Sequence, residues 1–203
     1  MRTEATMHSI SVELNGIRIA TIGLARMDVV NVSVHGALDI EHKAMLHAMG
    51  SNYAEGGCRH LIWIAERTLL PGDIVDVRLH ADGDGGGDVG KTIAELYPDE
   101  PPCTITDFSI SADMAETLRS RPRLHERFVV QAEASSAQRV RAASDALNTD
   151  FTFGVLWDRF EPARARVRLT THCLDDVLAR TGGRQHLRTM LSADERASFS
   201  LLV

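Results

Sequence analysis

The clearest chemical spacing in the chain lies in a glycine-rich segment of its first half. Gly85, Gly90, Lys91 and Thr92 follow the order Gly-x-x-x-x-Gly-Lys-Thr, which is the pattern of a phosphate-binding loop. In such a loop, backbone N–H groups hold the phosphates, the lysine contacts the β- and γ-phosphates, and the hydroxyl binds Mg²⁺. One alternative is therefore a nucleotide- or metal-dependent enzyme built on these four residues.

The surroundings of this motif disfavour a phosphate site. The chain reaches Pro98 within two helical turns of Thr92, which is too short for the helix whose N-terminus would hold the phosphates. Several carboxylates near the motif would also repel an anion: Asp76, Asp82, Asp84, Asp88 and Glu95. We therefore expect no nucleotide cofactor here.

The same stretch offers Asp82, Asp84 and Asp88 as oxygen ligands for Ca²⁺ or Mg²⁺. An EF-hand loop beginning at Asp82 would need an acidic residue where Gly86 stands and a glutamate where Ile93 stands. The spacing therefore favours a solvated acidic loop without a metal, and cation binding remains open as an alternative.

No convergent catalytic set is visible among the histidines and cysteines. The three cysteines, Cys58, Cys103 and Cys173, are widely separated, which disfavours a disulfide framework or a zinc ribbon. His172 and Cys173 are neighbours, and in an extended chain their side chains point to opposite faces. We therefore expect no catalytic residue and no metal ligand.

An arginine row in the second half is a candidate for binding a partner. Arg164, Arg166 and Arg168 alternate with apolar residues, so a strand would place the three guanidinium groups on one face. Guanidinium groups bind carboxylates in a bidentate geometry, through two parallel N–H···O hydrogen bonds. The row predicts either a contact for an acidic partner or an ordinary solvated strand face.

Charge is unevenly divided along the chain. Residues 1–100 contain 8 basic and 15 acidic side chains, whereas residues 101–203 contain 14 and 13. The acidic first half disfavours general nucleic-acid binding, which needs clustered cations. No apolar run approaches the ~20 residues that span a bilayer, and the polar start gives no sign of secretion. We therefore expect a cytoplasmic protein.

The periodicity predicts an α+β protein in two units. In the first, residues 1–97, alternating apolar residues predict about five strands, and Asn15-Gly16 predicts a hairpin turn. One helix is expected over residues 39–49, and residues 61–65 are expected to form a central strand.

Residues 98–102 contain three prolines and are expected to form a linker. Residues 103–203 predict alternating strands and helices, an α/β sandwich-like unit. Helices are expected to begin after Ser111, after Ser136, at Leu174 and at the sequence Ser192-Ala193-Asp194-Glu195.

These features favour a non-catalytic protein-binding module, and a homo-oligomer is an open possibility. One concrete form is a bacterial immunity or inhibitor protein that neutralises a toxin by occluding it. The candidate contact residues are an acidic patch from the first half and the arginine row: Asp73, Asp76, Asp82, Asp84, Asp88, Arg164, Arg166 and Arg168.

Overall fold

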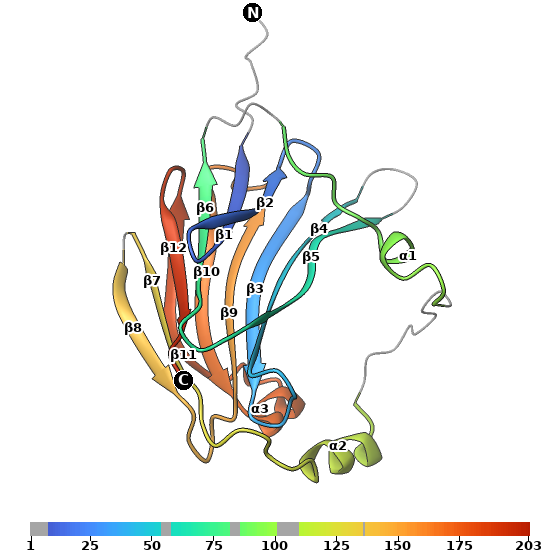
Figure 1. The fold of residues 1–203 in the computed structure, drawn as a ribbon, viewed down its shortest axis with the longest axis vertical. Helices are drawn as coiled ribbons and strands as arrows, with labels where there is room; N and C mark the ends of the chain where they lie inside the picture. The colour runs from blue at the N-terminus through green and yellow to red at the C-terminus, as the bar shows by residue number, and fades with distance from the viewer. Residues whose placement is uncertain (1–7, 54–57, 82–85, 101–109, 136) are drawn as a thin grey trace, which may run out of the picture.

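The computed structural model describes residues 8–53, 58–81, 86–100, 110–135 and 137–203. They form two antiparallel six-stranded sheets with short helices at the periphery (Figure 1). The expected α+β class is therefore wrong, since the fold is mostly β. The described part of the chain contains no helix that is long and apolar enough to cross a membrane.

Sheet A has the strand order β2-β1-β6-β12-β7-β8, and sheet B has the order β11-β10-β9-β3-β4-β5. The strands of sheet A are β1 (Ser9–Leu14), β2 (Ile17–Gly23), β6 (Ile74–His80), β7 (Val129–Ala134), β8 (Ala137–Ala143) and β12 (Arg196–Leu201). Those of sheet B are β3 (Val29–Ala37), β4 (Ala44–Asn52), β5 (Arg59–Leu69), β9 (Asp150–Asp158), β10 (Arg164–His172) and β11 (Arg184–Ser192).

Alternation of buried and more exposed residues along strands such as β3, β9 and β10 produces this sandwich. In β9 every second side chain from Phe151 to Trp157 is buried, because successive residues of a strand point to opposite faces. The inner faces meet through aromatic rings. Phe199 of sheet A lies 5.7 Å from Phe151 and 5.3 Å from Phe153 of sheet B, between ring centroids.

The expected division at residues 98–102 does not separate the two sheets. Each sheet combines three strands from residues 1–97 with three from residues 103–203. In sheet A, β12 from the second half of the chain lies between two strands. It pairs with β6 from the first half and with β7 from the second half. Residues 101–109 lie outside the described part of the chain.

The first hairpin is confirmed. Asn15 and Gly16 have φ angles of 54° and 77°, as a type I′ turn between β1 and β2 requires. Two expected helices are also confirmed, α2 (Ala112–Arg119) and α3 (Leu174–Ala179). The Ser111 hydroxyl caps α2 by accepting a hydrogen bond from the Met114 amide.

Three expected helices are wrong. Residues 44–49 belong to β4, residues 137–143 form β8, and residues 193–195 form the turn between β11 and β12. In β4 the side chains of Ala44, Leu46 and Ala48 are fully buried. These alanines and leucines also suit a helix, so pairing with β3 and β5 decides the structure there.

The short helix α1 (Ile93–Leu96) and α2 lie outside the two sheets, on the right in Figure 1. Strand β5 is an edge strand of sheet B, so the expectation that residues 61–65 form a central strand is wrong. Its apolar residues Leu61, Trp63 and Ile64 pack against the core from this edge.

Candidate protein-binding face

The arginine row lies on the outer face of sheet B. Along β10, Arg164, Arg166 and Arg168 are exposed, and the residues between them are buried in the core. The three guanidinium groups therefore project from one face, as the alternation predicts. We call this outer surface around β9, β10 and β11 the arginine face.

The arginines on this face differ in their partners. Arg166 forms an ion pair with Asp158 at 2.8 Å, and Arg164 lies 3.6 Å from Glu161. Among the described residues, no carboxylate lies within ion-pair distance of Arg168 or of Arg188 on β11.

Arg168 and Arg188 stand directly opposite each other on neighbouring antiparallel strands. Like charges directly opposite each other on neighbouring strands are destabilising. The fold thus maintains an unfavourable pair of cations, and an anionic group bound between or beside them would relieve the repulsion. Sequence analysis missed Arg188, although Leu187 and Leu191 alternate with polar residues in a strand-like way.

A hollow of about 280 Å³ adjoins Arg168. Gly154 on β9 is the cross-strand partner of Arg168 on one side and of Ser33 on the other, so no side chain rises between them. The residues around the hollow come from three strands and one loop: Asn31, Thr152, Gly154, Leu156, Arg166, Arg168, Thr170 and Gly182.

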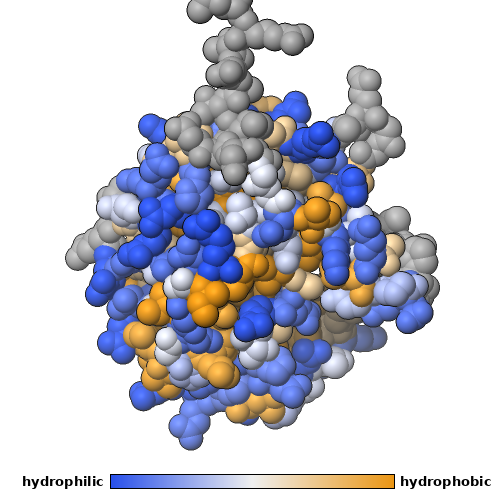
Figure 2. All heavy atoms as spheres, turned by 45° about the horizontal axis from the view of Figure 1, so that its top comes forward, coloured by the Kyte–Doolittle hydropathy of each residue, from blue (hydrophilic) through white to orange (hydrophobic). Residues whose placement is uncertain are grey.

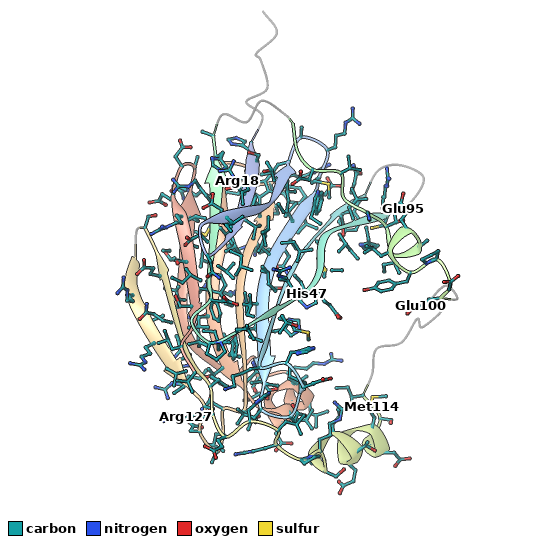
Figure 3. The ribbon with its side chains drawn as sticks, in the orientation of Figure 1. Arg18, His47, Glu95, Glu100, Met114 and Arg127 are labelled. Atoms are coloured by element: carbon teal, nitrogen blue, oxygen red, sulfur yellow. The ribbon has the colours of Figure 1, made fainter. Side chains whose placement is uncertain are left out.

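On the other side of Gly154, Ser33 of β3 is paired in turn with His47 of β4. His47 is labelled in Figure 3. His47 stacks on His35 with ring centroids 4.6 Å apart. The Nε2 atom of His47 is buried and has no hydrogen-bond partner among the described residues. The pKa of His35 is lowered, first by burial and then by charge on His47, while Glu66 acts in the opposite direction.

This shift predicts a loss of stability in mild acid. Because the pKa of folded His35 lies below its ordinary value of 6.5, the unfolded chain binds a proton first as the pH falls. Stability should be complete above about pH 6.5 and decline below it. In thermal melts from neutral to mildly acidic pH, His35→Gln should flatten this decline. An unchanged slope would show that His35 does not contribute, since His80 and His186 also have lowered pKa values.

The acidic candidates lie on separate elements with separate partners. Asp73 accepts hydrogen bonds from the Asn15 side chain and the Leu70 amide, each at 2.7 Å. Asp76 faces Arg196 at 3.7 Å on the outer face of sheet A. Asp88 accepts from the Thr21 amide at 2.7 Å. Asp82 and Asp84 lie outside the described residues.

The glycine-rich segment bridges the free edges of the two sheets. At one end, the Asp88 amide donates to the Thr21 carbonyl of β2 at 2.7 Å. At the other, Lys91 and Ile62 of β5 exchange two backbone hydrogen bonds of 2.9 and 2.8 Å. The Trp63 indole also donates to the Asp88 carbonyl. We call residues 86–91 the bridging segment.

The Lys91 amide and both donor groups of Thr92 have partners within the protein. The Lys91 amide bonds to Ile62, and the Thr92 amide and hydroxyl both donate to Glu95, at 2.7 and 2.8 Å. A Cβ atom on Gly90 would lie 2.9 Å from the Trp63 ring, so this glycine allows close packing against β5. Gly85 lies outside the described residues.

The remaining clusters of polar side chains among the described residues do not converge on one site. Within the described residues, no group of three or more histidine, cysteine or acidic side chains is placed to hold a metal ion. The Cys58 thiol lies 3.3 Å from Nε2 of His60, whose Nδ1 is 2.8 Å from the Ser51 hydroxyl. Cys173 instead points to the Asp176 carboxylate.

A further hollow of about 430 Å³ lies beside α2 and α3. Burial raises the pKa of Asp150 there; a hydrogen bond from Thr149 and the charge of His172 oppose this shift, and Asp39 adds to it. The lining also includes three arginines: Arg119, Arg121 and Arg123. With both signs of charge present, this hollow indicates no single class of ligand.

The face of the molecule drawn in Figure 2 is mixed in character. Figure 2 shows hydrophilic side chains interspersed with smaller hydrophobic areas on the face turned toward the viewer. Comparisons with protein-family models, curated proteins and solved structures found no match. The fold and the site together define a two-sheet β-sandwich with an arginine-bearing outer face.

Proposed function

We propose that this protein is a non-catalytic binding module that docks an acidic protein on the arginine face. The observation that carries the proposal is the directly opposed pair Arg168 and Arg188, which lacks a carboxylate partner among the described residues. Cations held in this way favour a bound anion, and planar guanidinium groups suit carboxylates.

A protein carboxylate fits this face better than a nucleic acid does. Asp158 and Glu161 stand among the arginines and would repel a continuous row of phosphates. The net charge of the chain is −6, which also opposes general phosphate binding. A bacterial immunity or inhibitor protein of the cytoplasm, which occludes a toxin, is one concrete form of this function.

The acidic patch has less support as the primary contact. Asp73 and Asp88 are engaged in hydrogen bonds that hold turns and edges of the fold, and Asp76 faces Arg196. The partner surface therefore centres on Arg166, Arg168 and Arg188, with the acidic groups outside it.

Charge reversal tests this proposal. In Arg168→Glu/Arg188→Glu, the affinity for a short polyglutamate peptide at low salt should fall on the order of a hundredfold, about tenfold for each lost charge-assisted contact. Titration calorimetry measures the change. The matched control is Arg127→Glu/Arg141→Glu, because both arginines are exposed, Arg141 is paired with Gln131 and not with a second arginine, and the net charge of the two variants is the same.

The control variant should bind polyglutamate as tightly as the unaltered protein. Equal losses in both variants, or no binding by the unaltered protein, would overturn the proposal. Tighter binding of heparin than of polyglutamate through the same arginines would also contradict it, because it would identify a polyanion site of another class.

A further inference from the structure

Gly154 occupies a position where the fold itself does not require glycine. Its φ is not among the positive values in the described chain, and a Cβ atom would meet nothing nearer than the Asn31 side-chain oxygen at 3.8 Å. Gly36 on β3 is different, since its Cβ would lie 2.1 Å from the Lys43 carbonyl oxygen. Glycine inside a strand weakens it, and often marks the close approach of a ligand.

The hollow above Gly154 combines a cation with an apolar wall. Arg166 is held by Asp158, so Arg168 supplies the available guanidinium group beside Gly154. Leu156 lies two residues along the same face of β9 and lines the hollow. Thr152 and Thr170 provide hydroxyl groups at its other end.

We propose that this hollow receives a single glutamate side chain of the acidic partner. This inference rests on the function proposed above. The carboxylate binds the Arg168 guanidinium group, next to the repelling charge of Arg188. The methylene groups of the glutamate pack on the glycine backbone and on Leu156, where apolar contact is favourable. An aspartate side chain is shorter and makes less of this contact.

Filling the hollow tests the proposal without removing any charge. Gly154→Val places a β-branched side chain where the glutamate would lie, and its melting temperature should equal or exceed that of the unaltered protein. Its affinity for polyglutamate should fall about tenfold, the loss of one well-placed contact. If valine lowers the melting temperature, Gly154→Ala introduces a smaller side chain, and it should also lower the affinity for polyglutamate.

The control is Ser200→Val, which adds a β-branched residue to β12 of the opposite sheet and should leave the affinity unchanged. The unaltered protein should also prefer polyglutamate to polyaspartate, and Gly154→Val should lose this preference.

The two proposals fail in different ways. If Gly154→Val binds polyglutamate like the unaltered protein while Arg168→Glu/Arg188→Glu does not, the glutamate subsite is wrong and the arginine face stands. If charge reversal has no effect, the arginine face is wrong, and the subsite is wrong with it.

Discussion

Replacing Phe199 with alanine should lower the free energy of unfolding by about 3–5 kcal/mol. The Phe199 ring is fully buried and contacts Phe151 and Phe153 of the opposite sheet. Its removal leaves a cavity between the sheets, because packed neighbours relax only partly. Denaturant unfolding followed by circular dichroism and tryptophan fluorescence measures the change.

Phe160→Ala is the matched control for this experiment. The Phe160 side chain is 87% exposed, so the same substitution should change stability by no more than about 0.5 kcal/mol. The two tryptophans report on both halves of the chain, since Trp63 lies in β5 and Trp157 in β9. One shared transition is expected. Separate transitions would instead support independent units at 1–97 and 103–203.

Replacing Gly87 with valine should destabilise the protein by about 2–3 kcal/mol. A Cβ atom at this position would lie 2.5 Å from the Gly23 amide nitrogen and 3.1 Å from the Thr21 carbonyl oxygen. Both contacts are to backbone, which cannot move without disturbing β2. Thermal and denaturant unfolding measure the effect.

Lys91→Ala distinguishes the bridging segment from a phosphate loop. The Lys91 residue is exposed, and its backbone bonds to Ile62 remain in the variant, so its stability should change by less than about 0.5 kcal/mol. Millimolar ATP or GTP with Mg²⁺ should not alter the melting temperature of either protein. A nucleotide-induced rise that Lys91→Ala abolishes would restore the enzyme alternative, because saturating ligand stabilises by a few kcal/mol.

The sequence predicts those parts of the fold that depend on local chemistry. The Asn15-Gly16 turn and the alternating residues of β10 lie as expected, because a turn with positive φ and a strand half buried in a core both leave a local pattern. The projection of Arg164, Arg166 and Arg168 from one face follows from the same period of two.

The errors arise where partners far apart in the sequence decide the structure. Residues 44–49 contain helix-forming alanine, leucine and methionine, and they form β4 because β3 and β5 pair with them. Ser192 and Glu195 do share a capping-type hydrogen bond, but it closes a turn between strands. Gly154 and Arg188 become candidates only when cross-strand register places both beside Arg168.

The position of β12 has a consequence for how the protein is made. Strands β6 and β7 do not pair with each other, since β12 lies between them. During synthesis, the inner edges of β6 and β7 remain open until residues 196–201 have emerged. Unpaired strand edges promote association between chains. Conditions that slow or interrupt translation of β12 should therefore favour aggregation more than equal delays before β7.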